Sequence, residues 1–189
     1  HGLDLHVSWK NDSTRRGISF IDPQKDRSIV VVGKRLEPSA LDNLPWNELE
    51  SCQAIFVSAG DQKVLKLCRK SDFLVSTPRL GVNVIKNIPF KLDVLIGSHM
   101  DKDERRISNE IKHKALVTIE TEGSKGGKYT PGGNYKAVTL GNELLDTYGC
   151  GDHFAAGVTT GIGCGLSLER SISLGAHCGA RAAQILGPY

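Results

Sequence analysis

The segment DTYGCGDHFAAG, residues 146–157, places two glycines and a carboxylate in a turn that leads into a helix-compatible run. Gly149 and Gly151 permit backbone angles that a side chain would forbid, and they let another molecule approach the main chain closely. From Phe154 the residues are apolar and suit a helix, so free N–H groups at its N-terminus would favour an anion. Asp152 would repel that anion unless it handles a proton or a metal. The pattern therefore predicts chemistry at a bound anion such as a phosphate.

A short G-x-G-D pattern also describes an ordinary helix cap, but the whole twelve-residue segment is more specific. It resembles the C-terminal signature of the PfkB family of carbohydrate kinases, the ribokinase-like proteins, which is written D-T-x-G-A-G-D-x-F-x-x-G. Cys150 stands where the family has alanine. The resemblance implies that Asp152 is the catalytic base and that the backbone N–H groups of Gly149, Cys150 and Gly151 stabilise the transferred phosphoryl group.

Three other segments extend the resemblance. LVTIETEGSKGGKY, residues 116–129, is similar to the family's strand and T-x-G-x-x-G loop, which contacts the nucleotide. DVLIGSHMDKDE, residues 93–104, resembles the strand before N-x-x-E, with Ser98 in place of Asn and Asp101 in place of Glu. LGAHCGARAAQIL, residues 174–186, resembles the final helix, which lies against the adenine. The implied nucleotide-binding residues are Thr121, Gly123, Ser124, Gly126 and His177, and the implied magnesium ligands are Asp101 and Asp146.

Composition restricts the classes of partner. The 189 residues carry a dispersed net charge of +3, which does not indicate nucleic-acid binding. The longest apolar runs, SIVVVG and AIFVSAG, are strand-sized and far short of the ~20 residues that span a bilayer. Five cysteines without a C-x-x-C pair indicate free thiols in a reducing compartment and argue against a zinc site. We therefore expect a cytoplasmic protein with no nucleic-acid or membrane partner.

Short apolar segments alternate with helix-length segments along most of the chain. The predicted strands are 54–58, 73–76, 93–96 and 116–121, and the predicted helices are 62–70, 102–113 and two that follow residue 149. This alternation predicts βαβ units and an α/β fold with a mostly parallel sheet, and the resemblance implies the three-layer α/β/α sandwich of ribokinase-like proteins. Ligands bind beyond the carboxyl ends of such strands, where the loops SAGD, GSHMD, TEGSKGG and DTYGCGD would meet. The chain has no Walker motif and no dinucleotide-binding motif.

The first 35 residues differ from the rest. LDLHVSW, residues 3–9, and GISFID, residues 17–22, alternate with a period of two and predict strands, as does 28–32. Residues 15–31 resemble the family's second lid segment, so we expect a partial β lid over 1–35 and a nucleotide-binding core over 36–189. Family members are longer and His1 is not an initiator Met. We therefore expect the C-terminal part of a longer kinase whose sugar-gripping residues mostly precede it.

The function that the resemblance implies is ATP-dependent phosphorylation of a hydroxyl on a sugar or sugar-like molecule, with magnesium as cofactor. A nucleoside acceptor is an alternative. A second class is a non-catalytic nucleotide-binding or regulatory module on the same fold, which the altered S-x-x-D favours. A third is an unrelated enzyme with Cys150 as nucleophile, because thiols at helix N-termini have lowered pKa values, although Cys150 also suits plain packing. The lid is the surface we consider for a homodimer.

Overall fold

A six-stranded sheet forms the centre of the computed structural model, which describes residues 2–21, 27–139, 141 and 144–187. The strands lie in chain order as β3 (Ala54–Val57), β4 (Phe73–Ser76), β5 (Leu92–Ser98), β6 (Ala115–Thr121), β7 (Gly127–Thr130) and β8 (Asn134–Tyr135). β3 to β6 are parallel, whereas β7 and β8 return as antiparallel strands. The prediction of a mostly parallel sheet is confirmed.

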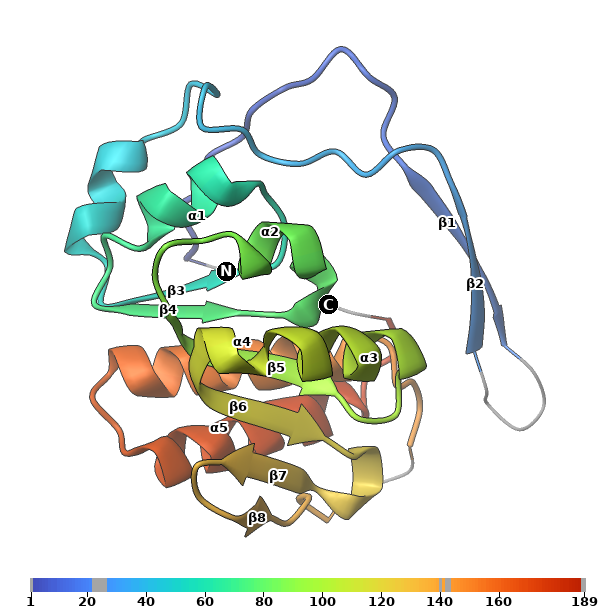
Figure 1. Cartoon of the computed structure of the whole chain (residues 1–189). Coiled ribbons are helices and arrows are strands. Elements are labelled where there is room, and N and C mark those ends of the chain that lie inside the picture. The colour runs from blue at the N-terminus through green and yellow to red at the C-terminus, as the bar shows by residue number, and fades with distance from the viewer. Residues whose placement is uncertain (1, 22–26, 140, 142–143, 188–189) are drawn as a thin grey trace.

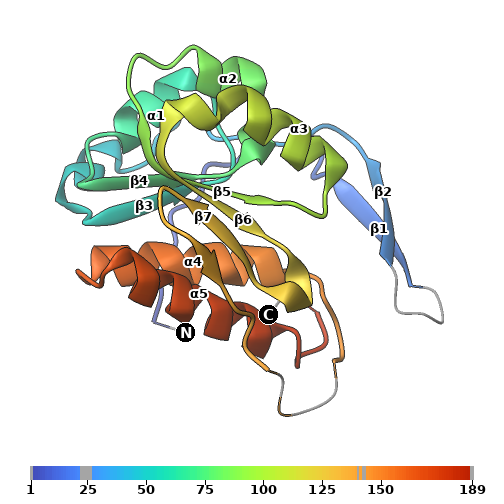
Figure 2. The same ribbon diagram turned by 60° about the horizontal axis from the view of Figure 1, so that its bottom comes forward.

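Helices cover both faces of this sheet. They are α1 (Gln62–Cys68), α2 (Val82–Lys86), α3 (Lys102–Ile111), α4 (Cys150–Gly163) and α5 (Leu168–Ala182), with 3-10 turns η1 (Trp46–Ser51), η2 (Pro78–Leu80), η3 (Lys112–Lys114) and η4 (Gly123–Lys125). Figure 2 shows α1, α2 and α3 over one face and α4 and α5 over the other. This is the predicted three-layer α/β/α sandwich. Helix α2 lies in a segment where the sequence predicts only a link broken by proline and glycine.

Side chains that alternate along the strands supply two hydrophobic cores. Leu74 packs with Leu65 and Ile85 on the α1 side, whereas its neighbour Val75 packs with Val158 on the α4 side. The side chains at four of these positions are fully buried: Leu74, Val75, Leu65 and Val158. A strand that is covered on both faces buries consecutive residues, which explains the continuous apolar runs in the sequence.

Before the sheet, β1 (Arg16–Ile21) and β2 (Arg27–Val32) form an antiparallel ribbon with Arg16 opposite Val32. Figure 1 shows the ribbon standing away from the sheet. The strand predicted at residues 3–9 is wrong, because this segment has no regular secondary structure. Its apolar side chains, such as Leu3 at 84% and Trp9 at 90% exposed, are not covered by any described part of the chain. The division at residue 35 into lid and core stays a prediction.

Candidate active site

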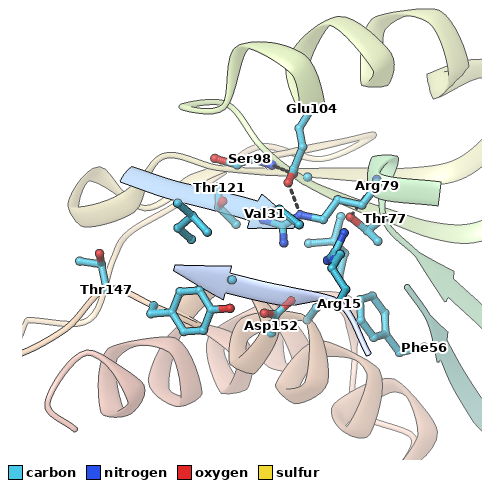
Figure 3. Close-up of a pocket in the computed structure, with 18 residues that line it drawn as sticks. Arg15, Val31, Phe56, Thr77, Arg79, Ser98, Glu104, Thr121, Thr147 and Asp152 are labelled. Carbon is cyan, nitrogen blue, oxygen red and sulfur yellow. Dashed lines mark hydrogen bonds and ion pairs between the residues drawn. The ribbon is translucent and has the colours of Figure 1, made fainter. Parts of the chain in front are cut away.

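A pocket of about 550 Å³ lies where the ribbon, the carboxyl ends of the parallel strands and the beginning of α4 meet (Figure 3). The pocket is lined by Arg15, Gly17, Ile29, Val31, Phe56, Thr77, Arg79, Ile96, Gly97, Ser98, Glu104, Thr121, Thr147, Tyr148, Gly149, Gly151, Asp152 and Ala155. It therefore joins segments that are far apart in the sequence. Its position beyond the strand ends agrees with the rule for open α/β sheets.

The glycine turn forms one wall of this pocket. Gly149 caps α4 in the left-handed conformation, with φ of 80°, which an L side chain rarely adopts. In the described part of the chain, the N–H groups of Gly149 and Gly151 donate to no carbonyl or side chain. The Cys150 N–H instead donates to the Thr147 carbonyl at 3.4 Å, and Cys150 does not line the pocket. Gly149 and Gly151 are thus better placed than Cys150 to bind an anion.

Asp152 lies in the first turn of α4 and lines the pocket. Figure 3 shows its carboxylate directed into the open space, with the Arg79 side chain above it. The side chain is solvent-exposed, so a molecule bound in the pocket could reach it. The conflict inferred from the sequence is therefore present in three dimensions: a carboxylate and the N-terminus of a long helix share one pocket.

Glu104 is a pocket residue that sequence reasoning missed. One carboxylate oxygen accepts a hydrogen bond from Arg79 Nε at 2.5 Å, and the other accepts the Ser98 N–H at 2.9 Å. The Glu104 side chain is 9% exposed, whereas that of Arg79 is 58% exposed. The only sequence signal was the D-x-x-E spacing of Asp101 and Glu104, which is typical of a capping box.

Burial and the neighbouring negative charges have opposite effects on the pKa of Arg79. Burial acts to lower the pKa of the guanidinium. The hydrogen bond to Glu104 and the negative charges of Glu104, Asp152 and Asp101 outweigh burial, so the pKa is raised overall. Arg79 therefore carries a permanent positive charge in a pocket that also holds Asp152.

The two predicted magnesium ligands are held by backbone groups. Asp101 caps α3, since one oxygen accepts the N–H groups of Asp103 and Glu104 at 2.9 and 3.0 Å. Asp146 is buried, and its two oxygens accept the N–H groups of Tyr148 and Gly187 at 2.9 and 3.1 Å. Neither residue lines the pocket. Within the described residues, no three histidine, cysteine or carboxylate side chains are grouped to hold a metal ion.

Of the predicted nucleotide-binding residues, only Thr121 lines the pocket. Gly123 and Ser124 belong to η4, directly after β6, and the turn closes with a 2.7 Å hydrogen bond from the Glu122 N–H to the Gly126 carbonyl. His177 lies exposed on α5, and its Nδ1 is 2.8 Å from the Ser173 carbonyl. The roles of these residues in nucleotide binding stay predictions.

Cys150 is a poor candidate for a nucleophile in this structure. Burial, followed by the negative charge of Asp146, raises the pKa of its thiol. A helix N-terminus could lower the pKa of a thiol, but burial and the Asp146 charge act in the opposite direction here. This direction does not favour the alternative of an unrelated enzyme that uses the Cys150 thiol.

We expect Cys150 to react slowly with iodoacetamide at pH 7 and faster only as the pH rises above the usual range of a thiol pKa. Cys164 is exposed and provides an internal reference. Mass spectrometry of the alkylated peptides over a pH series measures both rates.

Cys150→Ala should keep turnover within a few-fold, because the Cys150 thiol does not line the pocket. Near-complete loss of turnover in a folded Cys150→Ala protein would restore the thiol mechanism.

Comparison with known proteins shows the family to which the chain belongs. Residues 90–189, more than half of the chain, match the model described as pfkB family carbohydrate kinase. The chain belongs to the PfkB family of carbohydrate kinases. This match includes α4 with Asp152, and it confirms the resemblance read from the sequence. A search of curated proteins found no significant match.

Solved structures share the fold. The ribokinase of Cryptococcus neoformans var. grubii serotype A, in complex with ADP, has a TM-score of 0.72 at 21% identity over 95% of this chain and 68% of its own. Arabidopsis thaliana ribokinase, complexed with ribose and ATP, has a TM-score of 0.71 at 16% identity over 94% and 65%. The nucleoside kinase of Methanocaldococcus jannaschii has 0.66 at 15% identity over 95% and 64%. The chain thus has the ribokinase-like fold and spans less than two thirds of the last two proteins.

Proposed function

We propose that the protein transfers the γ-phosphoryl group of ATP to a hydroxyl of a sugar or nucleoside. The observation that carries the proposal is Asp152, which shares a pocket with the free N–H groups of Gly149 and Gly151 at the beginning of α4. An alcohol is a poor nucleophile until its proton leaves, and a positioned carboxylate can accept that proton. Family membership supports the same reaction, and relatives named as ribose-bound and nucleoside kinases support both acceptor classes.

In the proposed step, Asp152 takes the proton of the acceptor hydroxyl as the oxygen attacks the γ-phosphorus. A bond from that oxygen to phosphorus forms while the bond to the bridging oxygen of ADP breaks, and ADP leaves with the electron pair. The N–H groups of Gly149 and Gly151 would stabilise the charge that develops on the transferred group. Such preorganised donors are worth about 3 kcal/mol each in other enzymes.

Magnesium, when bound, would neutralise phosphate charge. The residues fit a water-mediated site, because magnesium usually keeps several waters and takes only one or two carboxylates. Asp101 is the better of the two predicted ligands, since its second oxygen accepts no hydrogen bond from the described residues. Asp146 fits less well, because backbone N–H groups engage both of its oxygens. We assign Asp146 to holding the turn before α4.

Two further features belong to this proposal. The cysteines of the structure are free thiols, which favours a reducing compartment such as the cytoplasm. The ribbon exposes apolar side chains, among them Phe20 at 58% and Val32 at 57%, and such a surface suits a homodimer through the lid. No helix of the described residues is long and apolar enough to cross a membrane.

A binding measurement followed by a transfer assay tests the function. We expect millimolar Mg-ATP to raise the melting temperature of the full-length protein by mass action, and a screen of sugars and nucleosides to release ADP. Binding without any transfer would support the non-catalytic module instead. A folded protein that shows neither a thermal shift nor ADP release would contradict both.

A further inference from the structure

Two arginines enter the pocket from different parts of the chain. Arg15 directly precedes β1, and Arg79 lies in η2 after β4. Figure 3 shows both side chains pointing into the space beside Asp152. Resting on the proposed function, we propose that Arg15 and Arg79 bind an anionic group of the acceptor, which makes the acceptor a sugar phosphate or a sugar acid. A guanidinium is a planar fork that matches the oxygens of phosphate and carboxylate.

The Arg79 side chain is fixed by its ion pair with Glu104. Glu104 is almost fully buried. One of its carboxylate oxygens accepts a hydrogen bond from Arg79 Nε, and the other accepts one from the Ser98 N–H. Among the described residues, the two terminal nitrogens of the Arg79 guanidinium have no hydrogen-bond partner. Because Nε is anchored, these two nitrogens are preorganised for a ligand at little further cost in side-chain entropy.

Arg15 supplies a second cation from the segment that precedes β1. It forms no hydrogen bond or ion pair with any residue that the structure describes, and it is solvent-exposed. Ile29 and Val31 of the neighbouring strand line the pocket beside it. An anion between Arg15 and Arg79 would therefore be held by two full charges against an apolar wall.

The charged donors of the pocket are the feature that distinguishes an anionic acceptor from a neutral one. Of its two carboxylates, Glu104 already accepts a hydrogen bond at each oxygen, and Asp152 is assigned to the proton. The pocket's strongest unused donors are cationic.

The nucleotide does not account for these arginines. Only Thr121 of the predicted nucleotide-binding residues reaches the pocket, so the base and ribose of ATP are expected beyond β6. In the proposed function, the N–H groups of Gly149 and Gly151 stabilise the transferred phosphoryl group, so that group does not require the arginines. Arg15 directly precedes the ribbon strand β1, whereas the predicted nucleotide loop η4 follows β6 of the central sheet. This distribution places the arginines on the acceptor side.

The test compares matched acceptors with the full-length protein in an assay coupled to ADP release. Fructose 6-phosphate and fructose form one pair, and gluconate and glucose form another. We expect turnover with at least one anionic member and little or none with its neutral counterpart. A preference for the phosphate or for the carboxylate identifies which anion the two arginines take.

Variants then assign the effect to the two side chains. Arg15→Met and Arg79→Met should each raise the KM of the anionic acceptor by about tenfold or more, while the KM of ATP stays within about two-fold, because each loses a charge-assisted hydrogen bond. Arg16→Met removes a charge from the adjacent ribbon position, which does not line the pocket, and should change neither value. Arg79→Lys should recover part of the loss.

A binding readout without ATP makes the assignment independent of turnover. The same anionic acceptor should raise the melting temperature of the wild-type protein and not that of the Arg15→Met, Arg79→Met double variant. Phosphorylation of neutral sugars alone would overturn the inference and leave the proposed function standing. A lower kcat in Arg79→Met with an unchanged acceptor KM would also overturn it, because Arg79 would then serve the transferred phosphoryl group. No ADP release with any acceptor would overturn both proposals together.

Discussion

Asp152→Asn should lower phosphoryl transfer by about 10²- to 10⁴-fold, the usual loss when a positioned base is removed. The affinity for ATP should stay nearly unchanged or improve slightly, because the substitution removes a negative charge beside an anion site. Steady-state kinetics of the full-length variant, together with a binding titration of Mg-ATP, separates the two effects. Asparagine keeps the shape of the side chain, so the helix and its glycine turn should form as before.

Glu169→Gln is the matched control for this experiment. Glu169 is the acidic residue in the first turn of α5, as Asp152 is in α4, and it does not line the pocket. Both substitutions weaken a favourable interaction with a helix dipole, which is worth about 0.3–1 kcal/mol, so both should change stability slightly. Only Asp152→Asn should change turnover. Turnover of a tenth or more of wild type in Asp152→Asn would show that Asp152 is not the base.

Gly126→Ala should destabilise the protein by about 3 kcal/mol or more, because it combines backbone strain with a steric collision. Gly126 has φ of 91° and ψ of −115°. An added Cβ would lie 2.1 Å from the Tyr135 carbonyl oxygen, which belongs to the backbone of β8 and cannot simply rotate away. Urea denaturation followed by circular dichroism measures the loss.

Gly133→Ala is the comparison within the same hairpin. A Cβ at Gly133 would meet nothing within 4 Å, so the expected change is within about 0.5 kcal/mol, as for most surface substitutions. If Gly126→Ala folds with the stability of wild type, the tight turn between β6 and β7 is not the conformation of the protein. If the two variants lose stability equally, the loss is not specific to the turn at Gly126.

The sequence by itself determined the layer order and the beginning of α4. Apolar segments that alternate with helix-length segments predict βαβ units and a mostly parallel sheet, and the resemblance to ribokinase-like proteins implied helices on both of its faces. Gly149 and Gly151 predicted the turn that precedes α4, because the required backbone angles and close approach are local properties of glycine. The position of Asp152 beside that turn could be predicted for the same reason, since it depends on only a few residues of chain, whereas its role as base stays a prediction.

Local pattern was insufficient where a partner decides the outcome. The apolar alternation of residues 3–9 predicts a strand, but a strand needs a neighbour to accept its hydrogen bonds and cover its apolar face. No described segment does either, and Leu5 is 83% exposed. The sequence likewise did not show that the Asp101 carboxylate caps α3, and its role as a magnesium ligand stays a prediction.

Tertiary structure alone assembled the charged pocket. Arg79 and Glu104 are 25 residues apart in the chain, on either side of β5, and their hydrogen bond exists because β4 and β5 are adjacent parallel strands whose carboxyl ends meet. Arg15 reaches the pocket from the segment before β1, which lies 64 residues before Arg79 in the sequence. Sequence spacing carries information about neighbours within one helix or strand. The direction in which a side chain of one element meets a side chain of another depends on how the layers pack, and packing is decided by the whole chain at once.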